Sequence, residues 1–163
     1  MKQLAAELAA IGLSDIKTYI QSGNVVFRHQ SCPPKELAQQ IGTCIAAKFG
    51  FEPHVAVLRA EDLMKGAKAN PFPDAVTDFD GKVLHLFFLS AAPASVDEAR
   101  LEAIRRPSDR WQIREDVFYL HTPEGFHDSK LAVRAEKILG VSATARNWRT
   151  VCALLELSGQ KLD

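Results

Sequence analysis

The chain has 163 residues, and its 20 lysines and arginines are balanced by 20 aspartates and glutamates. This length suits one domain or two small subdomains and is enough to bury a core. A formal net charge of zero excludes a histone-like protein that attracts polyanions with its whole surface. Any attraction to nucleic acid or to a membrane must therefore be local.

The first residues and the cysteines indicate a cytoplasmic protein. Lys2 and Glu7 interrupt the apolar residues of the opening segment, so no signal peptide is predicted. No segment has the roughly 20 consecutive apolar residues of a membrane span. Cys32, Cys44 and Cys152 are odd in number and far apart, which is typical of a reducing compartment. We expect a cytoplasmic protein with no membrane partner.

In the first half of the chain, hydrophobic spacing and turn residues predict a helix, a β-hairpin, a second helix, a strand and a third helix. Small residues that tolerate positive φ form the hairpin turn, and glycines mark the ends of two helices. The expected elements are a helix ending at Gly12, a hairpin over residues 16–27, a helix capped near Ser31 and ending at Gly50, a strand HVAVL (54–58) and a helix AEDLMKGAKA (60–69).

A stretch rich in Pro and Asp then predicts a linker over residues 71–82, between a first subdomain (1–70) and a second (83–163). The second subdomain has the same kinds of signal as the first. Its expected elements are a strand VLHLFFLS (83–90), a helix VDEARLEAIR (96–105), a hairpin of RWQIR (110–114) and VFYLH (117–121), a helix over 127–140, a short extended piece at 143–145 and a last helix opened by Asn147.

Both halves thus repeat one order of elements. The second half is β-α-β-β-α-β with a closing helix, which is the ferredoxin-like unit, and the first half has the same order without its opening strand. We therefore expect an α+β protein of two tandem ferredoxin-like (βαββαβ) subdomains, the first missing its opening strand. In that fold the opening strand lies inside the sheet, so its absence leaves neighbouring backbone groups unsatisfied. We expect either that the natural gene product begins upstream of Met1 or that another chain fills the gap.

Four short motifs occur in order along the chain: TYIQSGNVVF (18–27), ANPF (69–72), SKL (129–131) and TARNWRTV (144–151). With them the chain resembles, from about Leu4 to Leu157, the bacterial family catalogued as domain of unknown function 1697. The resemblance implies two tandem ferredoxin-like subdomains, an opening strand that this chain lacks, and no established activity. It brings no catalytic residues with it.

The segment with most candidate ligand groups is Arg146-Asn147-Trp148-Arg149. If Asn147 caps the last helix, an anion would meet free backbone N–H groups and two guanidinium groups together, and Trp148 would offer a stacking face to a base. In the alternative interpretation, Trp148 anchors the helix in the core and the two arginines pair with carboxylates. The sequence leaves both interpretations open.

A second basic group lies on the preceding helix. Lys130, Arg134 and Lys137 recur at i, i+4 and i+7 and so share one helix face. Charge is also uneven, since residues 126–150 contain five basic and two acidic residues. We interpret this face, together with Arg146 and Arg149, as a basic C-terminal patch. The alternative is a solvated helix face without a ligand.

The hairpin turn adds a third candidate, because small residues let a phosphate approach backbone N–H groups. The same residues are also what a tight hairpin needs, whatever its function. The complete predicted ligand-binding set is Ser22, Gly23, Asn24, Ser129, Lys130, Arg134, Arg146, Asn147 and Arg149.

Known motifs for metal, cofactor and nucleophilic chemistry are absent from the sequence. The five histidines make no HxH or HExxH spacing, and the chain has no CxxC, GxSxG, GxGxxG or GxxxxGK[ST] motif. Ser129, beside Lys130 and just after His127 and Asp128, is the one candidate nucleophile, although a helix cap at Asp128 or Ser129 is the simpler explanation. We predict no metal and no cofactor, and whether the protein is an enzyme stays undecided.

Three functions follow from these observations. The first is a binding module whose basic C-terminal patch holds a phosphorylated small molecule or a nucleic acid. The second is an enzyme of unassigned chemistry that uses a cleft between the two subdomains. The third is an assembly subunit that forms oligomers through exposed sheet edges.

Overall fold

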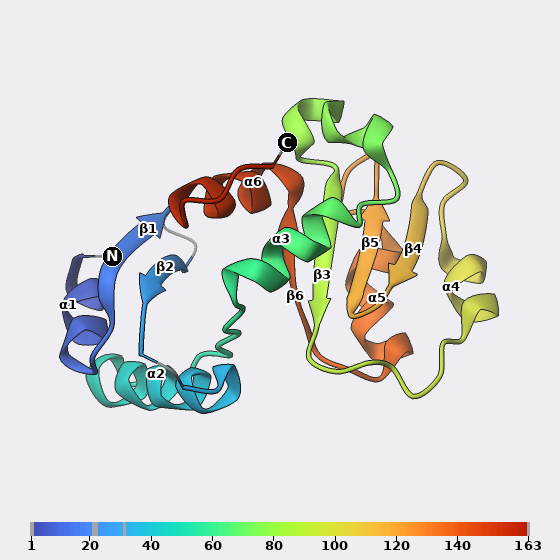
Figure 1. Cartoon of the computed structure of the whole chain (residues 1–163). Coiled ribbons are helices and arrows are strands. Elements are labelled where there is room, and N and C mark those ends of the chain that lie inside the picture. The colour runs from blue at the N-terminus through green and yellow to red at the C-terminus, as the bar shows by residue number, and fades with distance from the viewer. Residues whose placement is uncertain (1, 21–22, 31, 163) are drawn as a thin grey trace. The chain divides into compact units, whose positions relative to one another are not determined.

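The computed structural model describes residues 2–20, 23–30 and 32–162, which form an α+β protein with two sheets and six helices (Figure 1). The chain divides into two compact units. Unit 1 consists of residues 1–64 and 153–163, and unit 2 consists of residues 65–152. These units differ from the sequence-based division at residues 71–82 in two ways: the first boundary lies between residues 64 and 65, and the end of the last helix belongs to unit 1.

Unit 1 packs two helices against a β-hairpin. Its elements are α1 (Lys2–Ala10), β1 (Ser14–Tyr19), β2 (Asn24–Arg28) and α2 (Pro34–Phe49). The two strands pair antiparallel in a two-stranded sheet. Leu8, Leu13, Leu37 and Ile41 form the buried core. The predicted helix, hairpin and second helix are confirmed, including the α2 end at Gly50, where φ is +76°. Ser31, the expected cap, lies outside the described residues.

The strand predicted at residues 54–58 is wrong. The structure forms no regular element over residues 51–59, although Val55 and Val57 pack against the unit 1 core. Apolar side chains therefore point inward at alternate positions, as the sequence pattern requires. A strand also needs a neighbour for its backbone N–H and C=O groups, and in the described residues none lies beside this segment.

The predicted helix after this segment is present as α3 (Ala60–Lys68). The predicted linker that follows is instead folded into unit 2, where it forms two short 3-10 turns, η1 (Pro73–Val76) and η2 (Asp78–Gly81). Phe72 and Ala75 are buried, and the Asn70 side chain accepts a hydrogen bond from the backbone N–H of Phe72 at 2.9 Å. Pro and Asp interrupt regular structure here, but the two apolar side chains still hold the segment against the unit.

Unit 2 contains a four-stranded antiparallel sheet in the order β4-β5-β3-β6. Its elements are β3 (Leu84–Leu89), α4 (Glu98–Ile104), β4 (Arg110–Arg114), β5 (Val117–His121), α5 (Lys130–Leu139), β6 (Ala143–Asn147) and the first part of α6 (Trp148–Leu157). All were predicted, and the short extended piece at 143–145 proves to be a strand that runs on to Asn147.

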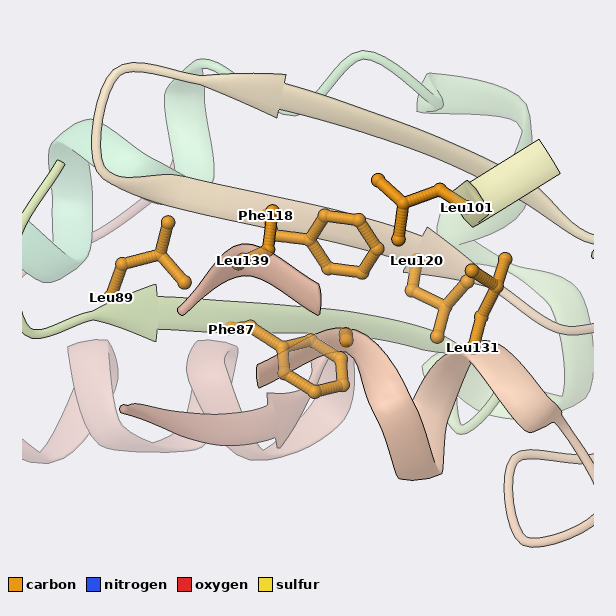
Figure 2. Close-up of a cluster of buried hydrophobic side chains, with 8 residues drawn as sticks. Phe87, Leu89, Leu101, Phe118, Leu120, Leu131 and Leu139 are labelled. Atoms are coloured by element: carbon orange, nitrogen blue, oxygen red, sulfur yellow. The ribbon is translucent and has the colours of Figure 1, made fainter. Parts of the chain in front are cut away.

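The main core of unit 2 lies on one face of this sheet, under α4 and α5 (Figure 2). It is formed by Phe87, Leu89, Leu101, Phe118, Leu120, Leu131, Ala135 and Leu139. Alternate residues of β3 and β5 point to the other face, where the Tyr119 hydroxyl donates to the Gly66 carbonyl of α3 at 2.7 Å. Because both faces are covered, every residue of β3 and β5 is buried, which explains their nearly continuous apolar sequences.

Within the described residues, no helix is both long enough and apolar enough to cross a membrane.

Candidate anion-binding surface

The start of α5 is held by a buried polar cluster that includes the predicted site residue Ser129. Its Oγ accepts from the Ala132 N–H at 3.4 Å and donates to Asp109 Oδ2 at 2.9 Å. Asp109 is fully buried, and Arg106 Nε lies 3.3 Å from its Oδ1. Ser129 is therefore a buried N-cap whose hydroxyl is already used.

Beyond this cap, α5 presents a basic face to solvent. Lys130, Arg134 and Lys137 are all exposed, and the buried residues of α5 lie on its opposite side. In the described part of the chain, no carboxylate forms an ion pair with any of these three side chains. We call these residues the α5 basic face.

Arg146 lies apart from the α5 basic face. On β6, Ala143 and Ala145 pack against the core beneath α5, and because side chains alternate along a strand, Arg146 points to the opposite face of the sheet. Its guanidinium donates to Thr144 Oγ1 at 3.1 Å and to the Ala145 carbonyl at 2.7 Å. Partial burial lowers the pKa of Arg146. The basic residues expected to form one patch are thus divided between two faces of the sheet.

Asn147 and Arg149 have the local roles that the sequence suggests for a helix start. Asn147 Oδ1 accepts from the Thr150 N–H at 2.9 Å, so Asn147 caps α6 as predicted. Arg149 is exposed and its Nη1 lies 2.7 Å from Asp80 Oδ2. Val151 of the same helix is buried, whereas Trp148 is half-buried. An anion at this helix start would compete with the Asp80 carboxylate for Arg149.

The candidate hairpin turn belongs to unit 1, whereas the other candidate residues belong to unit 2. Ser22 lies outside the described residues. Gly23 adopts φ +78° with open space around it, which suits a hairpin turn, and Asn24 is buried. That this turn contributes to ligand binding stays a prediction.

A charged network around His121 was not found by sequence reasoning. The buried His121 places Nε2 3.0 Å from Asp78 Oδ2, and its Nδ1 accepts from Arg110 Nε at 3.2 Å. Arg110 Nη2 in turn donates to Asp74 Oδ2 at 2.6 Å. Burial, followed by the Arg110 charge, lowers the pKa of His121. The network attaches η1 and η2 to the sheet. Because the residues of these turns are far apart in sequence from those of the sheet, no local sequence motif predicts the network.

The described residues offer little for metal or covalent chemistry. No group of three or more His, Cys, Asp or Glu side chains in this part of the chain is placed to hold a metal ion. An open groove runs along α1 and α2 in unit 1, lined by Ile11, Gln40 and Cys44, with Lys48 paired to Glu7 at 2.8 Å. Burial raises the pKa of the Cys152 thiol, which makes it a poorer nucleophile.

Comparison with known proteins gives a family match and a similar solved structure. The family described as "Protein of unknown function (DUF1697)" matches residues 1–119, which confirms the resemblance but ends before the TARNWRTV motif. The solved structure of the conserved bacterial protein SP0830 from Streptococcus pneumoniae is similar, with a TM-score of 0.67 and 20% identity over 97% of this chain and 88% of that one. No curated protein matches the chain.

Proposed function

The chain belongs to the DUF1697 family of proteins of unknown function, and we propose that it is a binding module whose α5 basic face holds the phosphate backbone of a nucleic acid. The observation that supports this proposal is the unpaired state of Lys130, Arg134 and Lys137 on one exposed helix face. Three cations on one helix face that form no ion pair with a carboxylate create a local positive potential on a molecule of zero net charge.

The geometry of this face favours a long polyanion over a small phosphorylated molecule. With a rise of 1.5 Å per residue, Lys130 lies about 6 Å from Arg134 and about 10 Å from Lys137 along the helix axis. Side chains spaced in this way on a convex helix can contact successive phosphates of one strand. A small phosphate ligand needs several donors converging on one point, and the Ser129 hydroxyl, the nearest candidate, already bonds to Asp109.

We further propose that each unit is one half of a tandem ferredoxin-like repeat. The β-α-β-β-α-β order of unit 2 and its antiparallel sheet order β4-β5-β3-β6 support this for the second half. In unit 1, the order α1-β1-β2-α2 supports the same assignment with fewer strands. The α5 basic face then lies on the solvent side of a helix that covers the sheet.

The test measures nucleic-acid affinity against salt concentration. Binding of labelled single-stranded and duplex oligonucleotides is followed by fluorescence anisotropy for the natural protein and for the Lys130→Ala, Arg134→Ala, Lys137→Ala triple variant. Each phosphate contact contributes about 0.7–0.9 to the magnitude of the slope of log K against log salt, so the triple variant should lose about 2–3 from that magnitude. Its affinity should fall by at least about tenfold at low salt.

A matched control separates the α5 basic face from net charge. The Lys35→Ala, Lys68→Ala, Lys82→Ala triple variant removes the same charge from three exposed lysines elsewhere, and it should retain the salt slope of the natural protein. Equal losses in the two triple variants would mean that the α5 basic face has no special role. Absence of any salt-dependent binding by the natural protein would contradict the proposal altogether.

A further inference from the structure

Residues 71–82 are attached to the rest of unit 2 by side chains and not by backbone pairing. Within the described part of the chain, the backbone–backbone hydrogen bonds of this segment join near neighbours in sequence. Its ion pairs with other elements come from three aspartates, each on a different element: Asp74 with Arg110 of β4 at 2.6 Å, Asp78 with His121 of β5 at 3.0 Å, and Asp80 with Arg149 of α6 at 2.7 Å. These three contacts, together with the buried Phe72 and Ala75, keep the segment against the unit.

The second turn of this segment, η2, has an unfavourable backbone conformation. Phe79 and Asp80 have φ of +46° and +59°, in the left-handed region that costs conformational energy for a residue with a Cβ. The Phe79 side chain is 72% exposed, so its packing offsets little of this cost. Asp78 and Asp80 form their ion pairs on either side of Phe79. The turn therefore depends on these two contacts and opens when one of them weakens.

One of the two contacts depends on the protonation of a buried histidine. His121 is 5% exposed, and its Nδ1 accepts from Arg110 Nε at 3.2 Å. The proton of the neutral ring is therefore on Nε2, which donates to Asp78 Oδ2 at 3.0 Å. A second proton would have to bind to Nδ1, the atom that the N–H groups of Arg110 face. It would replace an accepted hydrogen bond by contact between two cations.

The charged groups that face His121 come from three elements: Arg110 of β4, Asp74 of η1 and Asp78 of η2. Burial, followed by the Arg110 charge, lowers the pKa of His121, and the two carboxylates offset only part of this effect. When the segment opens, water reaches the ring and its pKa returns toward the ordinary 6.5. The open form thus binds the second proton more tightly. Closure is fully stabilised above pH 6.5 and weakens as pH falls toward the lowered pKa.

We propose that residues 71–82 form an acid-sensitive latch on unit 2, closed while His121 is neutral and opened when its Nδ1 takes up a proton from solvent. Asp78 and Asp80 lie in the same turn, so opening moves both of them. It thereby removes the carboxylate partner of Arg149 at the start of α6, and acid uncovers this guanidinium. The latch uses none of the residues of the α5 basic face, so it is independent of nucleic-acid binding there.

The experiment measures opening of the latch by amide hydrogen exchange, followed by NMR at residue resolution on the full chain near pH 7.5 and near pH 5.5. The reporters are the amides of Ala75, Asp80 and Lys82, whose hydrogen bonds close the two turns at 3.0, 3.2 and 3.3 Å. After correction for the intrinsic pH dependence of exchange, their opening constant should rise severalfold at the lower pH. An open-form pKa near 6.5 sets a ceiling of about tenfold. The reporters should also open more often than the amides of α5 at both pH values.

Two histidine variants provide matched controls. His121→Gln offers an amide donor toward Asp78 and an amide oxygen toward Arg110 but cannot ionise, so its latch should stay closed at both pH values. His85→Phe removes a second buried histidine of unit 2, on β3, and should leave the response of the reporters as it is in the natural protein.

The ring signals of His121 in the natural protein give a second test that needs no substitution, and this test decides the case in which His121→Gln itself opens the latch. The ring should titrate with an apparent pKa below 6.5, and the chemical shifts of the reporter amides should change with the same midpoint. Three outcomes overturn the proposal: reporter opening that is equal at the two pH values, an equal pH response in the natural protein and His121→Gln, or reporter opening no more frequent than that of α5.

Discussion

Unit 1 and unit 2 share a helix-strand-strand-helix order of elements and reach different degrees of burial. In unit 2, β3 and β5 are buried along their whole length, and Leu101, Phe118 and Leu131 have no exposed surface. In unit 1, neither strand of the hairpin is fully buried, and several apolar side chains around the core are only half-buried. A central strand with two paired neighbours makes the difference, because it supplies both hydrogen bonds and an inner row of side chains.

The largest effect that tests this comparison is the loss of one core leucine in each unit. Leu131→Ala in α5 removes a fully buried side chain and should cost about 4 kcal/mol of unfolding free energy, whereas Leu37→Ala in α2 should cost about 2–3 kcal/mol because its surroundings can collapse more easily. Urea unfolding followed by tryptophan fluorescence reports on unit 2, which contains both Trp111 and Trp148. Amide exchange in α2 reports on unit 1. Equal costs would mean that the two cores are equally well packed.

A second prediction concerns the pH dependence of unit 2. Burial, followed by the nearby His127 charge, lowers the pKa of His85 to about 4. The unfolded chain takes up a proton on this histidine near pH 6.5. The stability that a neutral His85 contributes to the fold is therefore complete above pH 6.5 and is lost as pH falls through 4. Between pH 7 and pH 4 the natural protein should lose about 3 kcal/mol more stability than His85→Phe.

The ring of His85 stacks on Phe126 at 3.7 Å between centroids, so a phenylalanine can keep that contact. Urea unfolding at several pH values, monitored by tryptophan fluorescence, measures the difference between the two proteins. If their stabilities change in parallel with pH, the neutral state of His85 has no energetic role in the fold.

The smallest effect compares two left-handed glycines, one in each unit. Gly50 ends α2 with φ +76° and open space, so Gly50→Ala should cost only about 1 kcal/mol. Gly81 has φ +71°, and a Cβ there would lie 3.1 Å from both the Arg149 backbone nitrogen and Trp148 Cδ1. Gly81→Ala should therefore cost about 2 kcal/mol and shift Trp148 fluorescence. Thermal unfolding of both variants measures the difference, and identical costs would mean that the contacts of Gly81 are easily relieved.

Local signals in the sequence located most of the elements. Gly50 and Gly140 end helices in the left-handed conformation, Ser129 and Asn147 cap helices, and the alternation of β4 against the apolar run of β5 predicts a hairpin. These predictions succeeded because caps and turns depend on neighbouring residues. The failure at residues 54–58 has the opposite cause, since a strand exists only where another segment pairs with it.

For the candidate ligand residues, too, the sequence predicted relations within one element and not relations between elements. Helical spacing correctly placed Lys130, Arg134 and Lys137 on one exposed face, because that relation holds within a single helix. The sequence could not separate Arg146 from them, because the face that a β6 side chain occupies depends on which residues of β6 pack beneath α5. Nor could it foresee that Asp80 pairs with Arg149, or that Asp78 and Arg110 enclose His121.

By itself, then, the sequence determined the helices, the hairpins, the zero net charge and the basic face of α5, all of which depend on residue types within a few positions of one another. Only the tertiary structure decided which strands have partners, that residues 71–82 are a folded part of unit 2, and which cations form no ion pair with a carboxylate. These features arise from pairing and burial between segments distant in sequence, where each hydrogen bond or ion pair depends on what the rest of the chain brings beside it.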